Sequence, residues 1–248
     1  MSRWLIVPCF NEAKRLDQSR ILSYTSTLQC NVLLVNDAST DTTQNLIDEI
    51  VLSSKGTVHS LVQARNSGKA EAVRTGMQWA ISREATEVGY TDADGAVSEP
   101  DLVQIFAELG ATPSRIGVVG SRVALLGRSI DRTTTRHFTG RVFATFASII
   151  LQQPIYDTQC GAKAFTASKQ LQRSLSSPFV SRWGFDVELL GRMFIEIAKD
   201  GNGHIIELPL QQWHDVSGSK IGVFTGIKTL LELLPIRRSL RQWARQPH

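Results

Sequence analysis

Two aspartates, Asp92 and Asp94, stand two residues apart directly after a short apolar run that ends at Thr91. Two carboxylates on one turn offer the oxygen ligands that Mg²⁺ or Mn²⁺ takes, and such a metal can bridge the phosphates of a nucleotide. An Asp-x-Asp pair is also ordinary turn chemistry, so the pair alone does not separate a metal site from a simple turn. Its meaning depends on which other polar residues lie close to it.

Three further segments place polar side chains just after apolar runs. They are Asn11 and Glu12 after residues 4–8, Asp37 after residues 32–36, and Lys69 after residues 58–63. One interpretation is that the first two segments only cap the helices that follow them. The alternative is that their amide and carboxylate groups bind a base or a ribose, while the helix that begins near Lys69 offers backbone N–H groups to an anion.

The apolar runs alternate with helical patterns through the first half of the chain. Strands are predicted at residues 4–8, 32–36, 58–63, 88–91 and 116–120, and helices at 13–28, 42–52, 69–82 and 100–109. The runs are continuously apolar, which is typical of parallel strands buried on both faces. The pattern predicts an open, doubly wound α/β sheet, in which ligands bind at the carboxyl ends of the strands. All the polar residues named above then lie together at the carboxyl-terminal edge of the sheet, which we call the mouth.

The second half of the chain is less regular. It shows helical patterns at residues 133–151 and 186–199, a polar glycine-containing stretch at 157–163, and a strand at 205–208. From residue 226 the pattern is again helical, and Pro235 is expected to break or kink that helix. We therefore predict one domain over residues 1–222, with halves 1–122 and 123–222, followed by an amphipathic helical tail at 223–248.

The net charge of +4 lies entirely in this tail. Its basic residues can serve as an interfacial membrane anchor, or they can form the solvated edge of a helix that packs on the core. The helix of residues 138–151 leaves the same choice between core packing and a membrane-facing element. The two interpretations stay open on sequence grounds.

Composition and missing motifs exclude several other classes of protein. Hydrophobic residues make up 42% and charged residues 20% of the 248, as in an ordinary globular protein. The three cysteines are odd in number and widely spaced, which indicates a reducing compartment and no structural zinc. No signal peptide, membrane-spanning run, Walker A loop, Gly-x-Gly-x-x-Gly or His-Glu-x-x-His is present. A nucleic-acid partner is not expected.

The chemistry-bearing segments resemble a known family. The series Pro-x-x-Asn-Glu, Asn-Asp-Ala-Ser-Thr-Asp, Asn-Ser-Gly-Lys and Asp-Ala-Asp-Gly is similar to that of the family 2 inverting glycosyltransferases with the GT-A fold. The stretches 157–165, 182–189 and 218–220 resemble the dolichyl-phosphate β-glucosyltransferase branch. Two features depart from it: Ala70-Glu71 replaces the usual glycines, and the N-terminal membrane anchor of the dolichyl-linked members is not in this sequence. The missing anchor leaves the identity of the acceptor less certain than that of the donor.

The resemblance implies roles for individual residues. The base and ribose would be held by Pro8, Asn11, Glu12 and Asp37, and Lys69 would lie near the nucleotide. Asp92 would touch the ribose and the metal, and Asp94 would bind Mg²⁺ or Mn²⁺. Arg122 and Arg136 would face the phosphates, and Lys220 would close over the donor. Asp157 is a further acceptor-side candidate. We expect Asp186 and Glu188 to position the acceptor, unless their helix simply exposes them to solvent.

The expected function is therefore a metal-dependent, inverting transfer of a hexose such as glucose from a UDP- or GDP-sugar to a polyprenyl phosphate. The expected location is the cytoplasmic face of a membrane, with the tail on its surface. One alternative keeps the enzyme but replaces the acceptor with a glycan, a glycolipid or a protein. Another is a catalytically silent nucleotide-sugar-binding module. A Rossmann dehydrogenase fits the strand–helix alternation but lacks the glycine fingerprint.

Overall fold

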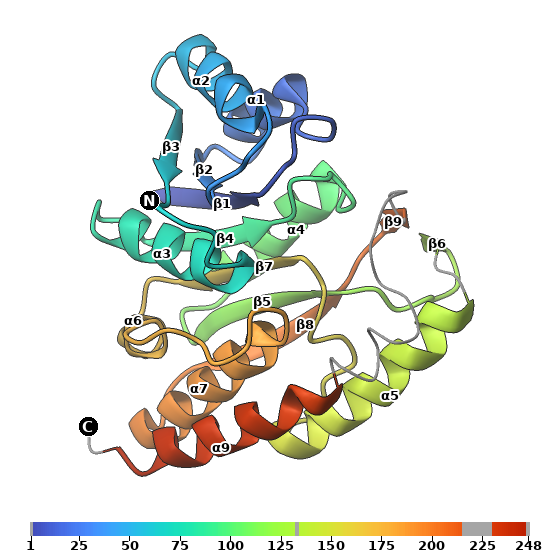
Figure 1. The fold of residues 1–248 in the computed structure, drawn as a ribbon. Coiled ribbons are helices and arrows are strands. Elements are labelled where there is room, and N and C mark those ends of the chain that lie inside the picture. Colours follow the sequence, from blue (N-terminus) through green and yellow to red (C-terminus); the bar gives the residue numbers. More distant parts are fainter. Residues whose placement is uncertain (1, 132–133, 215–229, 247–248) are drawn as a thin grey trace.

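A computed structural model of the chain describes residues 2–131, 134–214 and 230–246, and a seven-stranded sheet forms its centre (Figure 1). The strands lie in the order β3-β2-β1-β4-β7-β5-β8. Their bounds are Arg3–Cys9 (β1), Asn31–Asn36 (β2), Val58–Val62 (β3), Glu87–Thr91 (β4), Arg115–Ser121 (β5), Ala162–Thr166 (β7) and His204–Pro209 (β8). A small second sheet pairs β6 (Ser129–Asp131) with β9 (Gln212–His214) in parallel.

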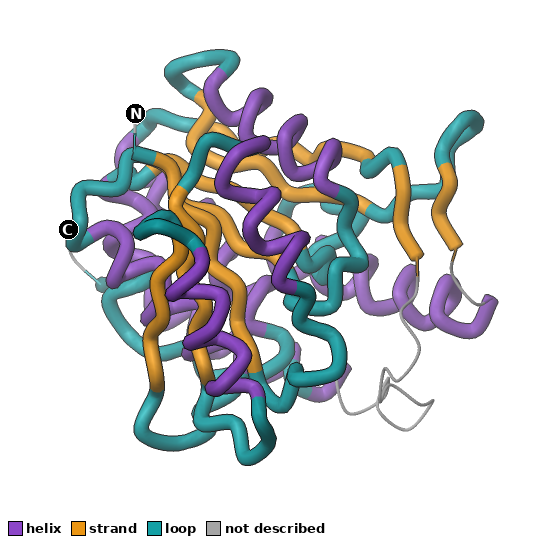
Figure 2. The backbone as a smooth tube through the Cα atoms, turned by 90° about the horizontal axis from the view of Figure 1, so that it is seen from above, coloured by secondary structure: helices purple, strands orange, loops and turns teal. Residues whose placement is uncertain are grey.

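Helices cover both faces of the large sheet (Figure 2). The buried apolar residues of α1 (Gln18–Thr27), α2 (Thr43–Ser53) and α4 (Glu99–Gly110) form one core cluster with one face of the sheet. Those of α3 (Lys69–Ile81), α5 (Thr134–Leu151), α6 (Lys169–Ser174), α7 (Phe185–Asp200) and α9 (Leu233–Ala244) form a second cluster with the other face. This arrangement confirms the predicted open, mostly parallel α/β fold.

The continuous apolar runs are explained by this double cover. In β1, Leu5 and Val7 point into the first cluster, whereas Trp4 and Ile6 point into the second. Successive side chains of a strand face opposite sides, so a strand covered on both faces needs apolar residues at every position. The same reasoning predicted β2, β4 and β5 to within a residue. The edge strand β3 was predicted to within a residue as well, although its His59 and Ser60 are only partly buried.

Strand β7 was not predicted, and it is the main difference. It runs antiparallel between β4 and β5, in the centre of the sheet. The sequence analysis assigned its beginning to a polar stretch, because Lys163 interrupts the apolar run. That lysine is buried, and its ammonium donates to Asp186 Oδ1 at 2.6 Å and to the carbonyl of Cys160 at 2.6 Å. The charge is tolerated in a central strand because it is paired there.

The first helix also begins later than predicted, at Gln18 rather than at residue 13. Asp17 caps it, since the carboxylate accepts a hydrogen bond from the backbone N–H of Arg20 at 3.1 Å. The residues between β1 and α1 remain a loop at the carboxyl end of the sheet.

The described part of the tail packs on the core. Helix α9 lies against α7 and α5 (Figure 1). Trp243 Nε1 donates to Glu196 Oε1 at 3.0 Å, and Gly191 of α7 lets Leu240 approach closely, since a Cβ there would lie 2.7 Å from Leu240 Cδ2. Pro235 lies in the first turn of α9, where the missing N–H breaks no helical hydrogen bond. The residues that α9 exposes include Arg237, Arg238, Arg241 and Arg245.

Among residues 2–131, 134–214 and 230–246, no helix is both long enough and apolar enough to cross a membrane.

Candidate active site

The charged residues predicted at the mouth lie around the carboxyl ends of β1, β3 and β4. Lys69 is the first residue of α3, and its ammonium forms an ion pair with Asp92 Oδ1. Burial disfavours the charge on Lys69, but the carboxylates of Asp92, Asp186 and Asp94 outweigh that penalty and raise its pKa. The structure thus brings together one cation and three of the predicted acidic residues.

Asp92 is confined on its other side by Gly161, which comes just before β7. A Cβ at residue 161 would lie 2.7 Å from Cγ of Asp92 and closer still to its Oδ2 atom. A side chain larger than hydrogen therefore does not fit at this position without moving the carboxylate. Lys69 and Gly161 together define where the Asp92 carboxylate lies.

The turn that carries Asp94 is held by Arg20, a residue of α1 that the sequence analysis missed. One guanidinium nitrogen of Arg20, Nη2, donates to the carbonyl of Ala93 at 3.0 Å and to that of Arg15 at 2.9 Å, and Nη1 lies 3.5 Å from the carbonyl of Asp94. Gly95 has a φ of 70°, and any side chain there would collide with this guanidinium. The backbone of the turn is thereby fixed before any ligand arrives.

The donor atoms of this turn suit a hard divalent cation. Burial raises the pKa of Asp94, and the neighbouring charge of Asp92 raises it further. Burial also raises the pKa of Glu12; its ion pair with Arg15 opposes the shift, and Asp94 and Asp92 add to it. Mutual repulsion of this kind is relieved when a cation binds. Within the described residues no group of three or more His, Cys, Asp or Glu is placed to hold a metal ion.

Arg122 and Asp157 form a bidentate ion pair at the end of β5. The distances are 2.6 Å from Arg122 Nε to Asp157 Oδ2 and 2.8 Å from Nη2 to Oδ1. The guanidinium carbon lies 4.8 Å from the ring centre of Trp213. Burial disfavours the charge on Arg122, but Asp157 outweighs this effect and raises its pKa. Glu207 in turn accepts the N–H of Asp157 at 2.8 Å, so Asp157 is placed to orient Arg122.

Asp186 lies below the mouth in a buried polar cluster. Its Oδ1 atom accepts hydrogen bonds from the ammonium of Lys163 and from the hydroxyl of Tyr90. Burial and the Asp186 carboxylate raise the pKa of Tyr90 well above 10.0, so the phenol stays a donor. The alternative that helix α7 exposes Asp186 is wrong, since this residue is 4% exposed.

Glu188 is buried as well, but its contacts lie within the packing of α7. Its carboxylate accepts from Arg192 Nη2 at 2.7 Å, from Ser239 Oγ at 2.7 Å and from the backbone N–H of Val180 at 2.8 Å. These partners tie α7 to α9 and to the loop after α6. The structure does not bring Glu188 to the charges at the mouth.

The remaining predicted residues shape the loops around the mouth. Both carboxylate oxygens of Asp37 accept backbone N–H groups, those of Ser67 and Gly68, at 2.7 Å. Asn11 has a φ of 56°, and its side-chain oxygen accepts the N–H of Thr40 at 2.8 Å. Pro8 lies in β1, opposite Val35 of β2. Lys220 and the side chain of Arg136 lie outside the described residues.

Two basic residues near the mouth, Arg15 and Arg20, have no role in the sequence analysis. Arg15 donates to both carboxylate oxygens of Glu12, at 2.5 Å and 2.7 Å. Arg15 lies in a segment, residues 9–16, that resembles the glucosyltransferase branch, but charged residues at the start of a helix have the same appearance, and nothing in the sequence marks Arg20. Nothing in the sequence marks the buried pair Lys163 and Tyr90. Their common partner, Asp186, is 23 residues from Lys163 and 96 residues from Tyr90.

The sequence matches the model of "Glycosyl transferase family 2" over residues 4–170. It is 30% identical over 245 residues to a dolichyl-phosphate beta-glucosyltransferase of Trichomonas vaginalis, a match that covers 93% of this chain and 69% of that protein. It is 32% identical over 237 residues to the human dolichyl-phosphate beta-glucosyltransferase, covering 89% and 69%.

Solved structures share the fold. Glucosyl-3-phosphoglycerate synthase of Mycobacterium tuberculosis, in complex with phosphoglyceric acid, superposes with a TM-score of 0.61 at 16% identity, covering 93% of this chain and 79% of that one. A mannosyltransferase of Pyrobaculum calidifontis, in complex with GDP-Man and Mn²⁺, gives 0.60 at 18% identity, covering 96% and 64%. At these identities the likeness concerns the fold alone.

Proposed function

The chain belongs to glycosyl transferase family 2, and from this premise we propose that it moves a hexose from a nucleotide diphosphate sugar to a polyprenyl phosphate. The observation that carries the proposal is the fixed Asp92–Asp94 turn, where Lys69 pairs with Asp92 and the charge of Arg122 also interacts with Asp92. The curated relatives, named as dolichyl-phosphate β-glucosyltransferases, support glucose as the sugar and a polyprenyl phosphate as the acceptor.

On the donor side, Asp92 and Asp94 would hold Mg²⁺ or Mn²⁺ against the diphosphate of a UDP- or GDP-sugar. Such an ion stabilises the negative charge that develops on the leaving diphosphate. Lys69 already lies beside Asp92 and adds a positive charge at the same place. The loops shaped by Asn11 and Asp37 would enclose the base and ribose.

On the acceptor side, Arg122 is the residue best suited to hold a phosphate. Asp157 orients its guanidinium, and two nitrogen atoms of a guanidinium match two phosphate oxygens. A phosphate monoester is a nucleophile at neutral pH because its second pKa is about 6. A strong general base is therefore unnecessary, and Asp186 would act by keeping Lys163 and Tyr90 in place beside Lys69. Direct in-line attack at the anomeric carbon inverts its configuration.

The test is a donor screen in the presence of Mn²⁺. UDP-glucose and GDP-mannose are incubated with and without a prenyl phosphate, the released diphosphate is measured, and the anomeric configuration of the product is read by NMR. We expect transfer to the phosphate, and an Asp94→Ala variant that melts like the wild type but transfers nothing. Asp48→Ala, on the exposed face of α2, is the matched control. Full activity of Asp94→Ala would overturn the metal assignment, and a chain that turns over no prenyl phosphate would overturn the acceptor.

We also propose that the exposed basic row of α9 rests on the cytoplasmic surface of a membrane. Helix α9 packs on α7 through apolar residues, so deleting it would disturb the fold. Replacing Arg237, Arg238 and Arg241 with glutamine removes the charge and keeps the packing. This variant should lose binding to vesicles that contain anionic lipid, as measured by co-sedimentation. Unchanged binding would refute a role for these arginines.

A further inference from the structure

Four large apolar side chains lie exposed close to the proposed donor site. Val180 is 54% exposed, Trp183 64%, Leu231 60% and Leu234 64%. They come from two segments, the loop before α7 and residues 231–234 around the start of α9, and we call them the rim patch. The hydroxyl of Ser181 donates to Glu232 Oε2, so the two segments are joined between the members of the patch.

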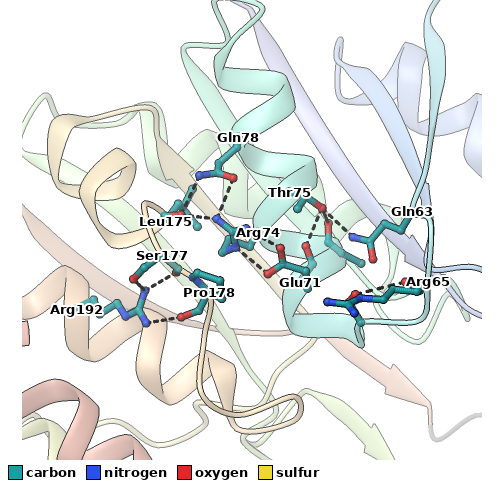
Figure 3. Close-up of polar contacts among 12 residues, drawn as sticks. Gln63, Arg65, Glu71, Arg74, Thr75, Gln78, Leu175, Ser177, Pro178 and Arg192 are labelled. Carbon is teal, nitrogen blue, oxygen red and sulfur yellow. Dashed lines mark hydrogen bonds and ion pairs between the residues drawn. The ribbon is translucent and has the colours of Figure 1, made fainter.

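The loop that carries Val180 and Trp183 is held from two sides, as Figure 3 shows for its first part. Arg74 and Gln78 of α3 both donate to the carbonyl of Leu175 at 2.9 Å. From the other side, Arg192 of α7 donates to the carbonyls of Ser177 and Pro178 at 2.8 Å and 2.9 Å. The guanidinium groups of Arg74 and Arg192 therefore hold this surface loop in place.

The second part of the loop is fixed as firmly. Glu188 accepts the N–H of Val180 at 2.8 Å, and Ser181 Oγ accepts the N–H of Gly184 at 2.7 Å. A Cβ at Gly184 would lie 2.9 Å from Ile236, so α9 sits directly on this turn. An ordered backbone that presents a tryptophan to solvent is unusual, because large aromatic side chains are normally highly buried. Such a preorganised apolar surface is suited to binding.

The loop that carries Val180 and Trp183 reaches the start of α3 through Arg182. Arg182, between Val180 and Trp183, donates to the carbonyl of Asn66 at 3.3 Å and also contacts its side chain. Its Nε atom lies where a Cβ at Gly68 would be only 2.6 Å away. Lys69 is the next residue, so the loop that carries the patch abuts the helix start that faces Asp92. The loop that carries Val180 and Trp183 therefore borders the proposed donor site.

We propose that the rim patch binds the isoprenoid chain of the acceptor. The proposal rests on the lipid phosphate acceptor proposed above and names the surface that takes its apolar part. The chemistry matches, since an isoprenoid chain offers only apolar surface and the four side chains do the same. A hexose stacked on Trp183 would use the indole but would leave Leu231 and Leu234 without a function.

The experiment compares two water-soluble acceptors with the same phosphate, dimethylallyl phosphate and the longer farnesyl phosphate, in the full-length protein. Wild type should prefer the longer acceptor in kcat/KM. Trp183→Ala should lower kcat/KM for farnesyl phosphate about tenfold and leave dimethylallyl phosphate and the KM of the donor within twofold. Leu234→Ser should act in the same direction. Leu52→Ser is the control, because Leu52 is 84% exposed and its helix α2 packs on the opposite face of the sheet from α7.

Because the four side chains are exposed, these variants should melt at the wild-type temperature. A raised KM for the donor in Trp183→Ala would assign the indole to the sugar and overturn the proposal. Equal loss with both acceptors, or no chain-length preference in the wild type, would overturn it as well. If the wild type uses neither acceptor, the proposed acceptor fails and the patch assignment fails with it. If every variant is active and keeps the wild-type preference for farnesyl phosphate, only the assignment of the rim patch is overturned.

Discussion

A methyl group at residue 161 would collide with a carboxylate that we assign to the donor site. Its Cβ would lie 2.7 Å from Cγ of Asp92. Non-bonded carbon atoms rest about 3.5–4.0 Å apart, so the carboxylate has to move by roughly 1 Å. Asp92 can make this movement, because its side chain is 29% exposed and ends at the mouth.

Gly161→Ala should therefore damage transfer far more than folding. Gly161 is not among the glycines with positive φ, so alanine fits the backbone and restricts the unfolded chain. The free energy of unfolding should change by less than about 1 kcal/mol. A misplacement of about 1 Å at a reacting group costs on the order of 100-fold in rate, equivalent to about 2.7 kcal/mol.

The assay measures kcat/KM for diphosphate release and Mn²⁺ binding by paramagnetic resonance in the presence of UDP. Gly110→Ala is the matched control, because a Cβ there meets only Glu87 Oε1, at 3.8 Å. We expect the control to behave as wild type, and Gly161→Ala to bind Mn²⁺ more weakly. A Gly161→Ala variant with more than a third of the wild-type kcat/KM and unchanged Mn²⁺ affinity would refute the placement of Asp92.

Three further predictions follow from groups described above. Arg20→Lys should weaken Mn²⁺ binding about tenfold with UDP present, because an ammonium cannot replace the guanidinium that holds the carbonyls of the Asp92–Asp94 turn. Unchanged resonance spectra would contradict this. Glu188→Gln leaves Arg192 buried without its counter-charge and should lower the free energy of unfolding in urea by about 3–5 kcal/mol, whereas the exposed Glu84→Gln should change nothing. Burial raises the pKa of Tyr24 from 10.0 to about 12, so the folded state keeps a proton that the unfolded state loses. Stability should be complete below pH 10 and fall as the pH rises toward 12, and Tyr24→Phe should make that fall less steep in thermal melts.

The strands and the mouth could be predicted because each signal is local. A strand covered on both faces is apolar at every position, and the polar residue that follows it must lie at the sheet edge. The sequence alone therefore predicts that Glu12, Lys69, Asp92 and Asp94 lie around one mouth. The strand ends are the most informative points of this chain.

The contacts of the interior charges could not be predicted in the same way. Lys163, Asp186, Glu188 and Arg192 appear in the sequence as solvent-exposed charges, and Lys163 even conceals a strand. They are buried because partners distant in sequence neutralise them, as Asp186 does for Lys163. A pattern read along one segment contains no information about such partners. Asp157 is likewise predicted on the acceptor side, but its bidentate pairing with Arg122, 35 residues away, could not be predicted from the sequence.

The position of β7 has a consequence for how the protein is made. Strand β5 belongs to the first 122 residues, yet its hydrogen-bonded neighbours are β7 and β8, both from the later part of the chain. Strand β4 likewise has β1 on one side and β7 on the other. When synthesis has reached Ser121, β5 has no strand to pair with, and one edge of β4 is open. Residues 1–122 therefore cannot finish folding on the ribosome until the later part of the chain has supplied β7, which pairs with both β4 and β5.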